Sequence, residues 1–138
     1  MSAKRVCMAL LVTLIVTGVF AQKKEYTVKV FDLQDVTTVL ENVSSSSSSS
    51  CESSDFPVYQ GATKTDINYA DLKSIIVRHD QPAEDPNNYV TVELEFMNGK
   101  TDLYEMVKHI RITGTSESGN FSIKIKDVNM IEVMHKPY

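Results

Sequence analysis

Apolar and polar side chains alternate along much of this chain, most clearly in its second half. Between residues 90 and 96, the apolar residues Val90, Val92, Leu94 and Phe96 alternate with Thr91, Glu93 and Glu95. This period of two predicts a strand with one buried and one solvated face. Asn98-Gly99 follows at once, and this dipeptide favours the positive φ angles of a tight hairpin turn. We therefore expect residues 100–104 to return antiparallel to residues 90–96.

Shorter segments elsewhere have the same alternation. The further predicted strands are 26–30, 36–43, 59–69, 74–79, 110–113, 121–126 and 130–135. Evidence for helices is weak, because no apolar stripe with a helical spacing extends beyond about eight residues. Segments 36–43 and 103–109 could each form a turn or two. Many short strands at this spacing predict an all-β fold, either a small antiparallel barrel or a sandwich.

Two pairs of segments resemble each other, which suggests an internal duplication. Residues 27–43 align without a gap on 91–107, and residues 66–77 align on 122–133. Both halves contain the pattern I-x-[YI]-x-D-[LV]-x-x-I-x-V, in which the aspartate is suited to a turn between two strands. The chain would then consist of two similar β units that share one core and are joined by residues 80–88. The alternative is that strand-rich stretches of similar composition align by chance.

The N-terminus has the layout of a secretory signal peptide. Lys4 and Arg5 precede an apolar run from Val6 to Phe20, and Ala21 completes a small-residue cleavage site. The run is shorter than the ~20 residues that a spanning helix needs, so cleavage is favoured over a retained membrane anchor. We expect residues 1–21 to be the signal peptide and residues 22–138 to form a single secreted or periplasmic/extracellular β domain, with no membrane span after cleavage.

A serine tract interrupts the first half of the chain. Residues 44–50 are all serine, and a stretch of this composition cannot bury apolar surface. We expect a disordered loop near 44–55, because a longer loop costs little additional closure entropy; a true linker after a loose N-terminal arm is the alternative. Cys51 would be the one cysteine left after cleavage. It is a candidate for an intermolecular disulfide, or it is an inert thiol.

Charge disfavours one class of partner. The full chain has 14 basic and 18 acidic side chains, a net charge of −4. Loss of Lys4 and Arg5 with the signal peptide leaves 12 basic against 18 acidic side chains, or −6. A surface of this sign repels phosphate backbones, so we expect no nucleic-acid partner.

No motif for catalysis, cofactor binding or metal binding is present. His79, His109 and His135 are widely separated and form no HxH or HExxH pair. The oxygen-rich segment 80–88 does not match the EF-hand pattern, and there is no G-x-S-x-G nucleophile elbow. We therefore predict no catalytic, cofactor-binding or metal-binding residues.

Two sequons, at Asn42 and Asn120, are acceptors for N-glycosylation in a host that performs it. Six tyrosines in the predicted mature chain are suited to contacts with glycans or proteins, although they also commonly cap the core of a small β domain.

These observations predict a secreted, non-catalytic β domain with a structural or protein-interaction role. Its partner would be an unknown protein or a component of the cell envelope. An edge strand would accept a partner strand through main-chain hydrogen bonds. Two alternatives remain open: a binder of a small ligand, calcium or a glycan, and a secreted hydrolase whose site is assembled from separate strands.

Overall fold

The computed structural model describes residues 26–46 and 53–136. The predicted signal peptide, residues 1–21, and Cys51 lie outside the described residues.

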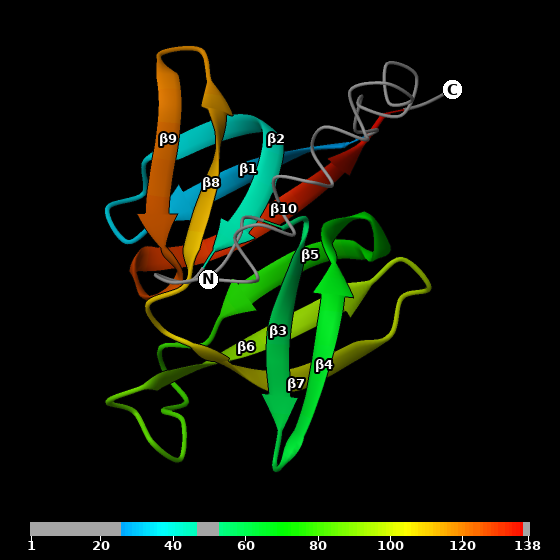
Figure 1. Ribbon diagram of the computed structural model, residues 1–138, viewed down its shortest axis with the longest axis vertical. Coiled ribbons are helices and arrows are strands. Elements are labelled where there is room, and N and C mark those ends of the chain that lie inside the picture. Colours follow the sequence, from blue (N-terminus) through cyan, green and yellow to red (C-terminus); the bar gives the residue numbers. More distant parts are fainter. Residues whose placement is uncertain (1–25, 47–52, 137–138) are drawn as a thin grey trace, which may run out of the picture.

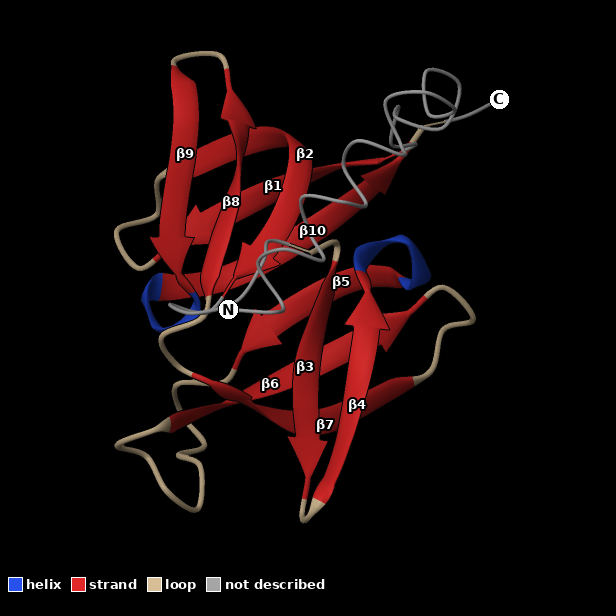
Figure 2. Ribbon diagram, in the orientation of Figure 1, coloured by secondary structure: helices blue, strands red, loops and turns tan. Residues whose placement is uncertain are grey.

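The described chain is almost entirely β structure, as the alternation predicts (Figures 1 and 2). The elements are β1 (Tyr26–Asp32), β2 (Thr37–Ser46), β3 (Asp55–Gln60), β4 (Thr63–Asn68), η2 (Tyr69–Asp71), β5 (Leu72–Val77), β6 (Tyr89–Phe96), β7 (Thr101–Val107), β8 (Arg111–Ser116), β9 (Gly119–Lys124), η3 (Ile125–Asp127) and β10 (Val128–His135). The strands form one antiparallel sheet in the order β4-β3-β7-β6-β5-β10-β1-β2-β8-β9. The sheet curls, so that the hairpins β3–β4 and β8–β9 cross in front of the central strands (Figure 2).

The predicted hairpin at Asn98-Gly99 is confirmed as β6–β7. Gly99 has a φ of +88°, a value that residues with a Cβ rarely adopt. The Asn98 side chain accepts a hydrogen bond from the main-chain N–H of Lys100. The turn therefore fixes the register of the β6–β7 pair.

Some predicted boundaries differ from the structure. Segment 59–69, expected as one strand, folds back on itself at Gly61, which has a φ of +59°, and forms the β3–β4 hairpin. A helical turn was an alternative for residues 36–43 and 103–109. Val36 directly precedes β2, residues 37–43 lie in β2, and residues 103–109 lie in β7 or in the turn that follows it.

The serine tract does not begin as a loop. Strand β2 continues through Ser44 to Ser46, where Ser44 pairs with Thr113 of β8. The main chains of Ser45 and Ser53 exchange two hydrogen bonds of 2.7 and 3.0 Å. The expected loop at 44–55 is therefore bridged near both of its ends, and residues 47–52 lie outside the described part of the chain.

The strand order is symmetric about its centre. The first five strands, β1 to β5, correspond in order to the last five, β6 to β10. When every strand is exchanged for its counterpart, the strand order of the sheet is the same but runs in the opposite direction. The centre is the β5–β10 pair, in which Ile75 lies opposite Ile131. Each half also has a 3-10 turn between its last two strands, η2 or η3.

The register follows the same symmetry. Val28 pairs with Leu40 in the first half, and Val92 pairs with Tyr104 at the counterpart positions of the second. Each hairpin pairs with the other half of the chain, since β8–β9 extends the sheet from β2 and β3–β4 extends it from β7. The two halves therefore exchange their hairpins across the centre of the sheet.

One core runs through both halves. The buried apolar residues form a single cluster that includes Val28, Leu40, Phe56, Ile75, Leu94, Ile112 and Ile131. They come from the inward positions of the central strands and from the hairpins that fold over them. Both halves of the chain therefore contribute to one core.

Candidate functional site

The sheet is not closed, and its two outermost strands each have one open edge. Strand β4 pairs with β3 alone and β9 pairs with β8 alone among the described residues. An open edge presents unpaired main-chain N–H and C=O groups, to which another strand can bind. The two edges are counterparts in the symmetric strand order.

The two edges have different side chains. Strand β4 carries the oppositely charged Lys64 and Asp66, both exposed, and such charges commonly protect an edge from strand addition. Strand β9 has the neutral Asn120 and Ser122 at the counterpart positions. Its single charged side chain is Lys124, at the C-terminal end. Strand β9 is therefore the less protected edge.

The hairpin register shows which groups of β9 are open. Ser116 and Gly119 flank a two-residue turn, and the pair that flanks such a turn exchanges its main-chain hydrogen bonds. Because bonded and non-bonded pairs alternate along the ladder, the main-chain groups of Asn120, Ser122 and Lys124 point away from β8. These three residues form the open edge of β9.

A polar groove of about 420 Å³ lies beside this edge. Hydroxyl and amide side chains dominate its lining, which consists of Asn42, Ser44, Thr113, Gly114, Thr115, Asn120, Phe121 and Ser122. The hydroxyls of Ser44 and Thr113 lie 3.0 Å apart and share a hydrogen bond. Asn42, at a φ of +52°, and Asn120 both line the groove, so the structure brings the two predicted sequons together.

The other half has a groove of about 470 Å³ at the counterpart position. The lining of this second groove differs at four counterpart positions. Thr113, Thr115, Asn120 and Ser122 of the first groove correspond, in this order, to Pro57, Tyr59, Lys64 and Asp66. The two halves thus present the same backbone framework with different chemistry. The β9 groove is neutral, and the β4 groove carries charges.

The histidines do not form a common site. The Nε2 atom of His79 lies 2.8 Å from the carbonyl oxygen of Val128, and that of His135 lies 2.9 Å from the carbonyl oxygen of Leu72. His79 and His135 are counterparts in the two halves. Their rings form hydrogen bonds at opposite ends of the β5–β10 pair. His109 lies apart, in the turn before β8. Within residues 26–46 and 53–136, no group of His, Cys, Asp and Glu side chains converges as a metal site would require.

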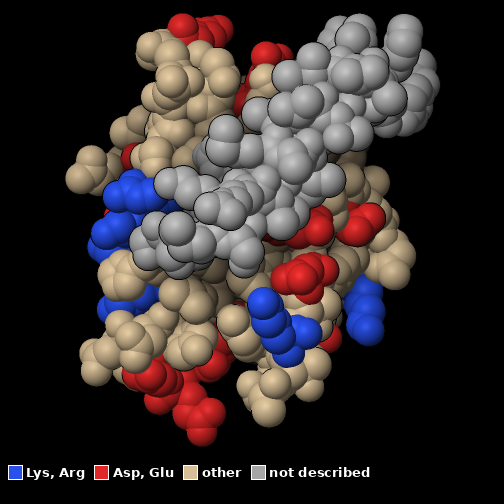
Figure 3. Space-filling model, viewed as in Figure 1, with Lys and Arg blue, Asp and Glu red and all other residues tan. Residues whose placement is uncertain are grey.

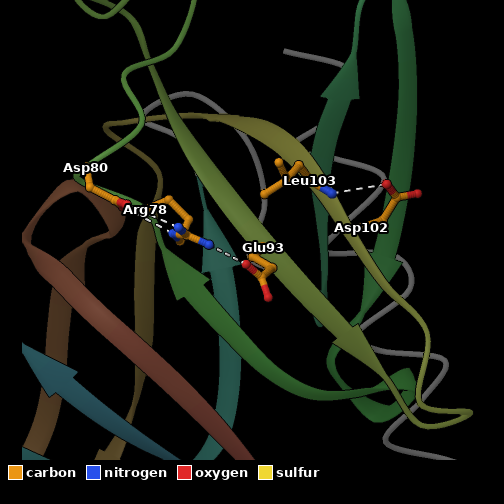
Figure 4. A network of polar contacts seen from close by, with 5 residues as sticks. All are labelled: Arg78, Asp80, Glu93, Asp102 and Leu103. Atoms are coloured by element: carbon orange, nitrogen blue, oxygen red, sulfur yellow. Dashed lines mark hydrogen bonds and ion pairs between the residues drawn. The ribbon is translucent and has the colours of Figure 1, made fainter.

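The oxygen-rich segment 80–88 is held by contacts within the protein. Arg78 donates to Asp80 at 3.1 Å and to Glu93 at 2.6 Å (Figure 4). The two carboxylates raise the pKa of the Arg78 guanidinium, and the hydrogen bonds from Arg78 lower the pKa of Asp80. Further along, Asp85 accepts a hydrogen bond from the side chain of Asn88. These contacts fix the loop against β6.

A buried hydroxyl pair lies under the start of the serine tract. The side-chain oxygens of Ser45 and Tyr69 are hydrogen-bonded in the interior. Complete burial raises the pKa of the Tyr69 phenol. Tyr26 packs nearby, and its hydroxyl is buried with no hydrogen-bond partner among the described residues. A position within a run of serines gave no sign that Ser45 would be part of the core.

The comparisons with known proteins give a family without a described activity. Neither the curated proteins nor the solved structures include a match to this chain. In the part of the chain that the structure describes, no helix has the length and apolarity needed to cross a membrane. Residues 22–136 match a family described as "Uncharacterised protein", and the chain belongs to that family.

Proposed function

We propose that this protein is a secreted, non-catalytic β domain that binds a partner protein by accepting an extended segment at the open edge of β9. The observation that carries the proposal is the unpaired edge of Asn120, Ser122 and Lys124, on which Lys124, at the C-terminal end, is the single charged side chain. Strand addition satisfies these main-chain groups, and side-chain pockets beside the edge provide specificity.

The contrast between the two edges supports β9 as the binding strand. The same framework carries Lys64 and Asp66 on β4, where the charges oppose addition. On β9, the core-facing side chains Phe121 and Ile123 are only partly buried. A partner strand would cover them, which adds apolar burial to the main-chain hydrogen bonds.

The proposed protein is secreted after cleavage of its signal peptide, and its β domain arose by duplication of one unit. Cleavage after Ala21 would leave a chain that starts where the family match starts, at residue 22. Matching registers in the two halves support an origin from two copies of one unit. In the secreted protein, Cys51 would be available for an intermolecular disulfide, which electrophoresis with and without reductant would test.

Amide hydrogen exchange in the presence of a strand-forming peptide tests the binding mode. A neutral octapeptide of alternating threonine and valine should slow exchange at Asn120 and Ser122. The variant Ser122→Pro removes an outward N–H that β8 does not use, so it should abolish the protection without unfolding the edge strand. The matched control Ser122→Ala keeps that N–H and should bind normally. Protection of the Asn120 amide that persists in Ser122→Pro, or the absence of protection in the unaltered protein, would reject strand addition at β9.

A glycan binder is the second candidate, because the groove beside β9 is lined by hydroxyl and amide groups. Such groups match the hydrogen-bonding pattern of a sugar. Chemical-shift changes confined to Thr113, Thr115 and Asn120 on addition of an oligosaccharide, without protection of the β9 main chain, would favour this function over strand addition.

A further inference from the structure

Four positively charged side chains and one histidine gather at the C-terminal end of β9. Figure 3 shows blue side chains over the ends of β8 and β9. The register places Arg111 opposite Lys124. Main-chain hydrogen bonds from Lys126 to Lys108 and from Ile125 to Ile110 bring η3 against the turn before β8. The basic patch consists of Lys108, His109, Arg111, Lys124 and Lys126.

Acidic side chains neutralise little of this charge. Among the described residues, Lys126 has a carboxylate partner, Asp127, at 3.1 Å. Arg111 donates to the hydroxyl of Ser122, and Lys108 donates to the carbonyl of Pro86. Burial, followed by Lys124, Lys108 and Lys126, lowers the pKa of His109, as expected where positive charges crowd together.

The basic patch is specific to one half of the molecule. The counterparts of Arg111 and Lys124 are Asp55 and Asn68, which pair in the same register at the base of the other hairpin. A positive cluster is unusual in a chain whose net charge is −4. The charge is therefore concentrated at the end of the edge that is open for strand addition.

We propose that the segment accepted by β9 is acidic, with Asp or Glu side chains that lie against the basic patch. This inference rests on the proposed function and adds the chemistry of the partner. An antiparallel partner runs opposite to β9, so the acidic residues would precede its strand-forming residues. Complementary charge fixes the register of the partner and speeds its association.

Three synthetic peptides test the proposal with the mature chain. One carries three acidic residues before an alternating threonine–valine segment, the second carries the same residues after it, and the third has three serines before it. We expect the first peptide to bind at least about tenfold more tightly than the third at low salt. Roughly 1 M salt should remove this advantage, because it screens charges beyond a few ångströms.

Variants assign the effect to the basic patch. The double variant Lys108→Gln/Lys124→Gln should lose most of the preference for the acidic peptide over the serine peptide, and circular dichroism should show an unchanged fold. Lys64→Gln removes a charge of the same sign from the opposite edge and should leave the acidic preference intact.

Each outcome is decisive. Equal binding of the acidic and serine peptides, with both protecting β9, would overturn the acidic partner and leave strand addition standing. Tighter binding of the second peptide would overturn the antiparallel placement. No protection by any peptide would overturn both proposals. An acidic preference of undiminished size in Lys108→Gln/Lys124→Gln would overturn its assignment to the basic patch.

Discussion

Ile75 lies directly opposite Ile131 at the centre of the sheet, and each isoleucine is the counterpart of the other in the two halves of the chain. Both side chains are fully buried. On either side, Ile75 faces Leu94 of β6 and Ile131 faces Val30 of β1, again at counterpart positions. The two halves are therefore joined through a continuous row of apolar side chains.

The first prediction concerns this central pair. Ile75→Ala and Ile131→Ala should each lower the free energy of unfolding by about 2–5 kcal/mol, because each removes fully buried methyl groups and leaves a cavity. Because the two isoleucines have equivalent neighbours, the two variants should lose similar amounts of unfolding free energy. Because the side chains are in contact, the double variant should depart from additivity. Urea unfolding measures all three values, and a large loss for one variant beside a negligible loss for the other would contradict the symmetry.

A second prediction concerns the two histidines at the ends of β5 and β10. His79→Ala and His135→Ala should each cost about 1 kcal/mol, the usual net value of one hydrogen bond to a main-chain carbonyl. In each ring the Nε2 atom must carry the proton that is donated. Nitrogen-15 spectra of the imidazoles at a pH where they are neutral should therefore show the Nε2-protonated tautomer. The Nδ1-protonated form in either ring would contradict the assigned donor.

The sequence predicted the local pairing well, because alternation and turn chemistry operate between neighbours. The β6–β7 hairpin followed from Val92, Leu94 and the Asn98-Gly99 turn. The strand order was beyond this reasoning, because the exchange of hairpins joins segments such as β2 and β8 that are far apart along the chain. The alignment also stopped short of His79 and His135, two residues beyond the last matched valines.

The candidate site was predicted only in outline. An edge strand was expected to accept a partner, but the sequence did not distinguish β9 from the other strands. Arg111 and Lys124 look like ordinary solvated positions on two amphipathic strands, and only the hairpin register places them side by side. The sequons at Asn42 and Asn120 come together for the same reason, across β2, β8 and β9.

A third prediction concerns the buried hydroxyl pair. Tyr69→Phe should cost about 1–3 kcal/mol, because it leaves the buried hydroxyl of Ser45 without its partner. Ser45→Ala should cost a similar amount by leaving the Tyr69 hydroxyl unpaired. The double variant removes both polar groups, so its loss should be smaller than the sum of the single losses. Chemical denaturation of the four proteins completes the cycle, and additive losses would show that the hydroxyls do not interact.

The fourth prediction is a pH dependence that arises from His109. Its pKa in the folded protein is lowered from 6.5 by burial and by the nearby lysines. The unfolded chain therefore binds the proton more tightly, and stability falls as the pH drops below about 6.5. His109→Gln should flatten the stability profile between this pH and the lower range in which carboxylates titrate. Lys124→Gln should reduce the slope by removing one repulsive charge. An unchanged slope in His109→Gln would assign the effect to other groups.

The last prediction uses the sequon on the open edge. Asn120 is exposed and lines the groove beside β9, so a glycan attached there in a glycosylating host would occupy the space that a partner strand needs. Protein with a glycan at Asn120 should lose the peptide-induced protection of Ser122, and Asn120→Gln, produced in the same host, should regain it. Protein with a glycan at Asn42 is the matched control. This glycan would lie in the same groove but leave the main chain of β9 free, so the protection of Ser122 should remain. Undiminished protection of Ser122 in protein shown by mass spectrometry to carry the Asn120 glycan would mean that partners do not approach along β9.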